Sequence, residues 1–151
     1  MESIEYYKND EWGYKIINDY LRYERTVNSY TKPNPKTEKH VQNIDLFTVS
    51  SVTEPITLYR GFRSFFDVDS TTSFVNLGYS SCSTDMDIAL RFSGIESYIL
   101  QFELPKDIKF YKYDDKNTWL IENEYLLQRG LQFTIIDRRD NIFYCTIASF
   151  S

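Results

Sequence analysis

Residues 121–130 read IENEYLLQRG, in which two glutamates, Glu122 and Glu124, stand one residue apart before an apolar run that ends at Gly130. Along an extended backbone, residues i and i+2 project to the same side, so both carboxylates can face one pocket. Their mutual repulsion favours one protonated and one ionised group, which suits acid/base chemistry. Two acidic groups near one carbon also suit glycosidic-bond chemistry, whose transition state is an oxocarbenium ion. Because Glu-x-Glu is also common on exposed strand edges, this stretch alone favours a structural role.

A second candidate is the stretch ITLYRG, residues 56–61, where an apolar strand pattern ends on Arg60 and Gly61. An arginine at the end of a strand, followed by a glycine that lets a ligand approach the backbone, suits a phosphate clamp. The alternative is a structural salt bridge, which this stretch alone favours.

The stretch GYSSCSTD, residues 78–85, is the third candidate because it packs five hydroxyl side chains into eight residues beside a glycine. This density suits hydrogen bonds to a sugar, or to a neighbouring side chain that must be aimed. The alternative is an ordinary loop before a helix, with Ser83 or Thr84 as the N-cap.

Other kinds of catalytic site are disfavoured by the supply of histidine and cysteine. The only histidine is His40, which lies in the polar stretch TKPNPKTEKH, so a Ser-His-Asp or Cys-His arrangement would have to use it. Cys82 and Cys145 are too few for a zinc site or a disulfide framework, and we expect free thiols, no metal and a location inside a cell. Chemistry here is expected to use carboxylates, hydroxyls and arginines.

Charge and length limit the remaining classes. A net charge of −5 with scattered basic residues disfavours nucleic-acid binding, which needs clustered Lys and Arg. The first ten residues, MESIEYYKND, do not form a signal peptide, and no segment is long and apolar enough for a membrane span. With 42% hydrophobic residues in 151, we expect one soluble folded domain over residues 1–151.

The periodicity predicts helices first and strands mostly after them. Helical spacing covers residues 11–25 and 38–50, separated by a loop at 31–37 that contains two prolines, and a short helix is expected at 85–93. Short runs rich in β-branched and aromatic residues predict strands, the last two joined by a hairpin loop at 138–141. The strands are expected at 56–61, 97–104, 124–128, 131–137 and 142–150. This order predicts an α+β domain.

Taken together, the three stretches resemble one family. The order Tyr59-Arg60-Gly61, then Tyr79-Ser80-Ser81-Cys82-Ser83, then Glu122 to Gly130 is similar to the mono-ADP-ribosyltransferases of the Arg-Ser-Glu class. That class includes cholera-like and clostridial actin-modifying toxins and the vertebrate arginine-specific ectoenzymes. Residues 17–22 are similar to the helix that precedes the first strand of the family, so the resemblance covers about residues 14–150.

The resemblance implies a pair of facing antiparallel sheets with N-terminal helices, and NAD bound in the cleft between the sheets. In the family, the residue that matches Arg60 clasps the phosphates of NAD. The residue that matches Ser81 orients the catalytic glutamate and contacts the ribose on the nicotinamide side. The residue that matches Glu124 holds the ribose 2′-hydroxyl and stabilises the cation that forms as nicotinamide leaves, which agrees with the physical chemistry of a fixed carboxylate.

The acceptor side of the resemblance involves Glu122 and Trp119. Relatives that modify asparagine or cysteine typically have glutamine at the position of Glu122, so a glutamate there implies arginine as the acceptor, with which a carboxylate pairs in fork geometry. Trp119 matches an aromatic residue that often contacts the target protein, and a core tryptophan is an equal alternative.

Further contacts with NAD are implied with structural alternatives beside them. Phe92 could stack on nicotinamide with Arg91 beside it, or Phe92 could be a core residue. The backbone of Gly61 could meet the carboxamide. Asn18 and Arg22 lie four residues apart on one helix face and could reach the adenosine, although surface solvation is their default.

The sequence departs from the family at three places. Cys82 replaces the usual threonine and Gln128 stands where many relatives have proline. The segment 106–120 is short, which predicts an abbreviated loop around NAD and a lower affinity for it. The sequence thus predicts a monomeric, toxin-like viral or bacterial effector that transfers ADP-ribose from NAD to an arginine of a target protein. An NAD glycohydrolase and a catalytically idle NAD-fold binding module are the alternatives.

Overall fold

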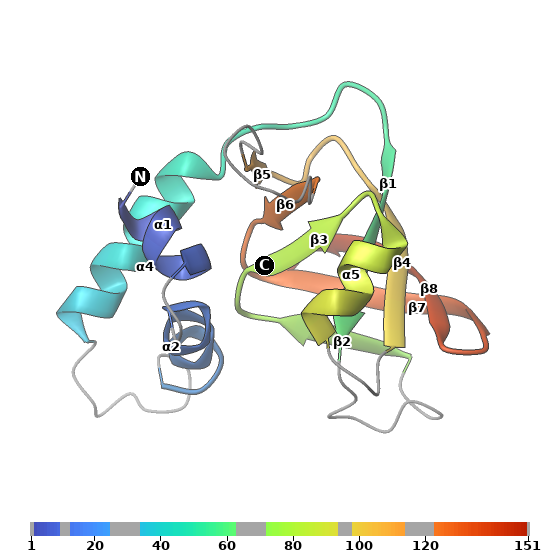
Figure 1. Ribbon diagram of the computed structural model, residues 1–151, viewed down its shortest axis with the longest axis horizontal. Helices are drawn as coiled ribbons and strands as arrows, with labels where there is room; N and C mark the ends of the chain where they lie inside the picture. Colours follow the sequence, from blue (N-terminus) through green and yellow to red (C-terminus); the bar gives the residue numbers. More distant parts are fainter. Residues whose placement is uncertain are drawn as a thin grey trace.

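A helical part lies beside a large β-sheet in the computed structural model (Figure 1). The structure describes residues 2–9, 13–24, 34–62, 72–93, 98–113 and 123–150. Within these ranges, no helix has both the length and the apolar character needed to cross a membrane.

The helical part begins with α1 (Glu2–Asn9), which the sequence reading missed, because eight residues give too short a periodic pattern. The predicted helix at 11–25 is confirmed over the described residues as α2 (Gly13–Asp19) followed directly by the π-helix η1 (Tyr20–Glu24). A π-helical turn within a helix is uncommon and frequently marks a functional site.

The next helix, α4 (Pro35–Phe47), starts earlier than predicted. Asn34 is its N-cap, because its side-chain oxygen accepts hydrogen bonds from the backbone N–H groups of Lys36 (3.1 Å) and Thr37 (3.3 Å). Pro35 occupies the first helical position, where a missing N–H is harmless. The predicted loop at 31–37 is therefore wrong for its last three residues, since proline was taken to exclude helix there. The helix also ends at Phe47 rather than at residue 50.

All eight strands of the described residues join in one sheet with the order β2-β7-β8-β4-β1-β3-β6-β5. The α+β prediction with N-terminal helices is confirmed. The family resemblance implied a pair of antiparallel sheets, whereas here hydrogen bonding is continuous and the β4–β8 pair is parallel. The strands are β1 (Ile56–Phe62), β2 (Ser73–Asn76), β3 (Ser80–Ser83), β4 (Tyr98–Leu104), β5 (Phe110–Lys112), β6 (Glu124–Leu127), β7 (Leu131–Arg139) and β8 (Ile142–Ser149).

The sequence predicted five of these strands, within a few residues at their ends, and missed β2, β3 and β5. Strand β3 has the sequence SSCS, which lacks the β-branched and aromatic residues that signal a strand. The short helix expected at 85–93 is α5 (Met86–Ser93). Its first turn is capped by Asp85, whose Oδ1 accepts from the N–H groups of Asp87 (2.9 Å) and Ile88 (3.4 Å), so neither Ser83 nor Thr84 is the N-cap.

Two clusters of buried residues flank strands β3 and β6. Cys82 and Leu127 contribute to one cluster, while Leu126 and Tyr79, just before β3, contribute to the other. The sheet core consists of Leu58, Phe62, Cys82, Leu100, Phe102, Leu104, Ile108, Phe110, Leu127, Leu131, Phe133, Phe143, Cys145 and Ile147. The helical core consists of Ile4, Tyr7, Ile17, Tyr20, Leu21, Val41, Ile44, Tyr79, Tyr113 and Leu126. Strands β3 and β6 are thereby held from both sides.

Candidate active site

Three adjacent strands, β1, β3 and β6, carry the three stretches that the sequence singled out. Ser83 of β3 lies opposite Glu124 of β6 and opposite Tyr59 of β1. Arg60, Ser81 and Glu124 are far apart in the sequence, and this register brings them into one region of the sheet.

Arg60 is half-buried, and its Nη1 donates a hydrogen bond to the backbone carbonyl of Ser81 at 3.2 Å. The thiol of Cys82 experiences the charges of both Arg60 and Glu124. Burial raises the pKa of Cys82 to about 12, Arg60 acts to lower it, and Glu124 adds to the rise. A cation and a carboxylate therefore lie near the same strand residue, and the thiol itself stays protonated at neutral pH.

Glu124 is only 6% exposed, although it begins strand β6. Its Oε2 lies 2.8 Å from Nζ of Lys8 on α1, and its backbone carbonyl accepts a hydrogen bond from the N–H of Tyr113 at 3.2 Å. The Lys8 ammonium also lies over the ring of Tyr113, 4.1 Å from the centroid. The glutamate is thus held at its backbone and its side chain.

The backbone directly before Glu124 is not extended. Asn123 has a φ of 44°, in the left-handed region that asparagine tolerates better than most residues. We expected an extended segment in which Glu122 and Glu124 project to the same side. The positive φ of Asn123 contradicts the extended backbone at that residue. Glu122 itself lies outside the described residues.

The N-terminal helices reach into this region through Tyr7 and Asn18. The side-chain amide of Asn18 donates to the hydroxyl of Tyr7 (2.9 Å), and its Oδ1 accepts from the backbone N–H of Tyr79 (2.9 Å). Burial raises the pKa of Tyr7, while hydrogen bonds with Asn18 and Ser81 and the charge of Arg60 act to lower it. Tyr7 therefore lies among groups from α2, β1 and β3, and Asn18 is buried rather than solvated.

The residues before β3 form a second set of polar contacts. Arg22 of η1 donates through Nε to Oδ1 of Asn76 at 3.0 Å, so it too contacts the protein rather than only solvent. The same Oδ1 accepts from the N–H of Gly78 (3.1 Å), and the Asn76 amide donates to Oγ of Ser80 (2.9 Å). A Cβ at Gly78 would lie 2.6 Å from Oδ1 of Asn18. Glycine is thus required for the close approach of α2 to this turn.

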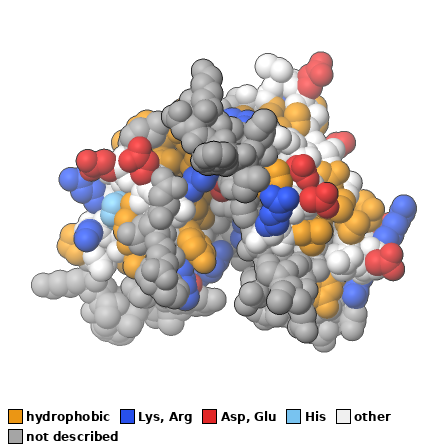
Figure 2. Space-filling model, in the orientation of Figure 1, with side chains coloured by type: hydrophobic (Ala, Val, Ile, Leu, Met, Phe, Trp, Pro, Cys, Tyr) orange, Lys and Arg blue, Asp and Glu red, His pale blue; other side chains and the backbone are white. Residues whose placement is uncertain are grey.

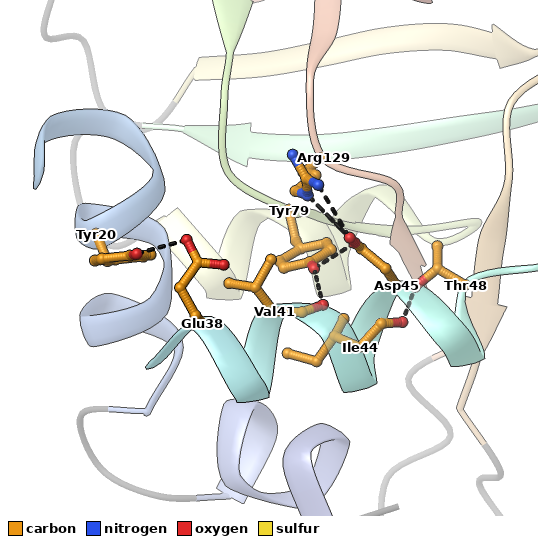
Figure 3. Close-up of polar contacts among 8 residues, drawn as sticks. All are labelled: Tyr20, Glu38, Val41, Ile44, Asp45, Thr48, Tyr79 and Arg129. Atoms are coloured by element: carbon orange, nitrogen blue, oxygen red, sulfur yellow. Dashed lines mark hydrogen bonds and ion pairs between the residues drawn. The ribbon is translucent and has the colours of Figure 1, made fainter. Parts of the chain in front are cut away.

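Figure 3 shows Asp45 of α4 with Tyr79 and Arg129, which lie at the same end of the antiparallel β3–β6 pair. The hydroxyl of Tyr79 donates to Oδ1 of Asp45 at 2.6 Å, and Nε of Arg129 lies 3.1 Å from Oδ2. Burial raises the pKa of Tyr79, and the hydrogen bond to Asp45 raises it further. Tyr79 precedes β3 and Arg129 follows β6, so this cluster of Asp45, Tyr79 and Arg129 ties both strands to one helix.

Two further predicted site residues are described and lie in β1 and α5. Gly61 is half-buried opposite Ile99 in the β1–β4 pair, and Arg91 is exposed near the end of α5. Phe92 belongs to α5, but its side chain lies outside the described part, as does Trp119.

Sequence reasoning missed Tyr7, Lys8, Asn76 and Asp45, because no motif marks them. Figure 2 shows a notch in the surface between the helical part and the sheet, with basic side chains beside it.

The family model described as ADP-ribosyltransferase exoenzyme matches residues 1–146 of the sequence. The chain belongs to this family. Members of the ADP-ribosyltransferase exoenzyme family transfer ADP-ribose from NAD to target proteins. The matched residues include α1, whereas the resemblance based on the motifs began at about residue 14. Among curated protein sequences, none gives a significant match.

Solved structures of bacterial ADP-ribosyltransferases share the fold. The C3 exoenzyme of Clostridium limosum has a TM-score of 0.70 and 21% identity, over 97% of this chain and 83% of that one. The ADP-ribosyltransferase Vis in complex with agmatine has a TM-score of 0.64 and 19% identity, over 99% and 73%. The toxin BECa of C. perfringens with NADH has a TM-score of 0.71 and 17% identity, over 97% of this chain but 42% of that one. Likeness at these identities establishes the fold.

Proposed function

We propose that this chain is an NAD-dependent mono-ADP-ribosyltransferase of the Arg-Ser-Glu class, which modifies an arginine of a target protein and releases nicotinamide. The observation that carries the proposal is the meeting of Arg60, Ser81 and Glu124 on adjacent strands, with Arg60 bonded to the Ser81 carbonyl and Glu124 buried. We extend the proposal to a single catalytic domain that acts as a monomer inside a cell.

The chemical character of these groups fits NAD as the substrate. NAD carries a diphosphate, and the half-buried guanidinium of Arg60 is a planar donor suited to phosphate oxygens. The ribose next to nicotinamide becomes positively charged as the leaving group departs, and the buried carboxylate of Glu124 supplies a fixed negative charge. Ser81, on the strand between them, has a hydroxyl that can hydrogen-bond the ribose or the glutamate.

In the proposed reaction, the bond between C1′ of the ribose and the nicotinamide nitrogen breaks, and its electron pair stays on nicotinamide, which leaves as a neutral molecule. Glu124 stabilises the resulting oxocarbenium ion. A guanidinium nitrogen of the acceptor arginine attacks C1′, and its proton passes to the carboxylate of Glu122. Each residue thus has a separate task, one for bond breaking and one for the acceptor.

Arginine as the acceptor rests on Glu122 of the Glu-x-Glu pair. Agmatine, which is bound by the related Vis, carries a guanidinium group like that of arginine. A carboxylate can hold a guanidinium through two parallel hydrogen bonds. Trp119, three residues earlier, is the proposed contact with the target protein.

Incubation of the purified chain with labelled NAD and a cell lysate tests the proposal, and mass spectrometry then locates the modified residue. Label on arginine supports transfer to protein. Nicotinamide release without label on protein would favour the glycohydrolase, and NAD binding without turnover would favour an idle binding module.

Substitution of the two glutamates tests the division of their roles. Glu124→Ala is expected to abolish both transfer and NAD hydrolysis, because both reactions pass through the ribose cation. Glu122→Gln is expected to remove transfer to arginine and to spare hydrolysis, because water needs no guanidinium clamp. Equal loss of both activities in the two variants would contradict this division.

A further inference from the structure

Helix α1 contacts Glu124 through the ammonium group of Lys8. Its Nζ lies 2.8 Å from Oε2 of Glu124 and 4.1 Å from the centroid of the Tyr113 ring. The two side chains of the pair are 21% and 7% exposed, respectively. The ammonium is therefore held between an aromatic face and a nearly buried carboxylate, in contrast to a surface ion pair.

A carboxylate this deeply buried needs a partner to stay ionised, because burial penalises the charged form. Of the charged groups of the described chain, Arg60 of β1 and Glu124 both lie near Cys82, and Lys8 contacts Glu124 directly. Tyr113, after β5, and Ser83, opposite on β3, also lie beside Glu124. Within the described part of the chain, Lys8 is thus a cation in direct contact with Glu124 that can fix its charged state.

The position of Lys8 is itself fixed by its neighbour in the sequence. Tyr7 is buried and accepts a hydrogen bond from Asn18 of α2, and its ring packs edge to face on Tyr79, with the centroids 5.9 Å apart. Ile4, one turn earlier, is buried in the helical core. Helix α1 is anchored by these contacts, so Lys8 extends from a rigid base rather than from a loose terminus.

We propose that Lys8 is a positioning residue of the transfer reaction, whose ammonium keeps the Glu124 carboxylate ionised and fixed in orientation. The inference rests on the proposed function. The contact engages one carboxylate oxygen, Oε2, and the stabilisation of the ribose cation requires only that the carboxylate remain negative and stationary. Lys8 thus acts through Glu124.

Three variants test the role of Lys8. Lys8→Met removes the charge and keeps the length of the side chain, whereas Lys8→Arg keeps the charge. Lys15→Met is the matched control, because Lys15 forms an ion pair with Asp19 on the exposed face of α2. We expect kcat for NAD hydrolysis to fall roughly 10- to 100-fold in Lys8→Met, because this variant loses about one charge-assisted hydrogen bond to Glu124. The change in KM should be much smaller. Lys8→Arg should restore most of the activity, and Lys15→Met should match the wild type.

The pH profile separates positioning from a merely structural role. Without a neighbouring cation, Glu124 needs a higher pH to stay ionised, so the acid limb of kcat should move to higher pH in Lys8→Met and not in Lys8→Arg. Circular dichroism at the assay temperature shows that each variant is folded. A lowered kcat with an unchanged acid limb in Lys8→Met would overturn the proposal. A rise of kcat in Lys8→Met would also overturn it, because the cation would then be blocking the site.

A direct titration keeps this inference separate from the proposed function. The carboxyl carbon resonance of Glu124 is assigned by its loss in Glu124→Gln and followed with pH in the wild type and in Lys8→Met. A midpoint that moves upward in Lys8→Met supports the inference, and an unmoved midpoint overturns it. If the wild type does not turn over NAD at all, the proposed function fails, whereas the titration still decides whether Lys8 holds Glu124 ionised.

Discussion

The two cores of this protein are built from different kinds of side chain. The sheet core contains aliphatic and phenylalanine side chains and two thiols, whereas four of the ten members of the helical core are tyrosines. Three of those tyrosine hydroxyls are hydrogen-bonded to other elements: Tyr7 to Asn18, Tyr20 to Glu38 and Tyr79 to Asp45. Apolar contact is non-directional, while a hydrogen bond requires a defined distance and angle.

The contrast follows from what each core supports. The sheet core holds strands that are already aligned by their own backbone ladders. The helices have no ladder to the sheet, and they must deliver Tyr7, Lys8 and Asn18 to fixed points beside β3 and β6. We therefore expect mutations in the sheet core to act mainly on the stability of the fold. Mutations of polar groups in the helical core should lower activity even where they change stability little.

The largest effect on stability is expected for Phe133→Ala. Phe133 is fully buried, stacks on Phe74 with ring centroids 5.1 Å apart, and meets Phe102 edge to face at 5.6 Å. Its truncation leaves a cavity and should lower the free energy of unfolding by about 3–5 kcal/mol. Urea denaturation measures this change, with Ile136→Ala, 66% exposed on the same strand, as the control that should change it by less than about 0.5 kcal/mol.

The specific activity of Phe133→Ala also tests the comparison. If the sheet core acts only through stability, the folded fraction should hydrolyse NAD at the wild-type rate at a temperature well below the unfolding midpoint. A loss of activity in fully folded Phe133→Ala would show that the sheet core also orients the site.

The next largest effect is expected for Gly78→Ala. The added Cβ would lie 2.6 Å from Oδ1 of Asn18, which must then release the N–H of Tyr79. A buried donor without a partner should lower the free energy of unfolding by roughly 1–3 kcal/mol, and the displaced α2 should raise KM for NAD. In an Asn18→Ala background the same glycine substitution should be milder, because the clashing oxygen is gone, and equal effects in both backgrounds would argue against this clash.

Tyr79→Phe should have a smaller effect on stability and a clear effect on activity. The change removes the hydroxyl that donates to Asp45 at 2.6 Å but keeps the buried ring. We expect about 1–2 kcal/mol in the free energy of unfolding, together with a several-fold loss of kcat as β3 loses its tie to α4. Tyr144→Phe on β8, a half-buried tyrosine of the sheet, should change neither quantity by much. A Tyr79→Phe variant with full activity would show that Asp45 and Arg129 suffice to hold the strands.

The division between the two cores also explains what the sequence could predict. The longest strands of the sheet, β1, β4, β7 and β8, contain β-branched and aromatic residues, and all four were predicted because this pattern is local. Strand β3 was missed because SSCS is held by pairing with β6 and not by its own propensity. Its place in the sheet is a property of the long-range register.

The candidate site was predictable to the same extent. Arg60, Ser81 and Glu124 belong to motifs in which the neighbouring residues carry the signal. Lys8 and Tyr7 lie in a short polar helix. The contact of Lys8 with Glu124 depends on how α1 packs against the sheet, and that of Tyr7 with Asn18 on how α1 packs against α2. Asn123 adopts a positive φ that no periodicity argument anticipates. Residues that position others through tertiary contacts therefore escape a motif-based prediction.

Alkaline pH should distinguish the cores through their titratable groups. At neutral pH its effect is the smallest of these, because the groups respond only as the pH approaches the ordinary thiol pKa of 9.0. Burial raises the pKa of the thiols of Cys82 and Cys145 in the sheet core from 9.0 to about 12. In the helical core, burial raises the pKa of the phenols of Tyr7 and Tyr79 from 10.0. Since these groups lose their protons more readily in the unfolded chain, stability is fully present below pH 9.0 and is lost as the pH rises towards about 12.

The order of these losses can be measured from the urea midpoint as a function of pH. In the wild type the decline should begin near pH 9.0, where the thiols of the unfolded chain start to ionise. In the Cys82→Ala/Cys145→Ala variant it should begin about one pH unit later, because the first groups to respond are then the tyrosines, with an ordinary pKa of 10.0. An identical pH dependence in both proteins would mean that the sheet core contributes nothing to the alkaline response, and that the buried phenols of the helical core account for all of it.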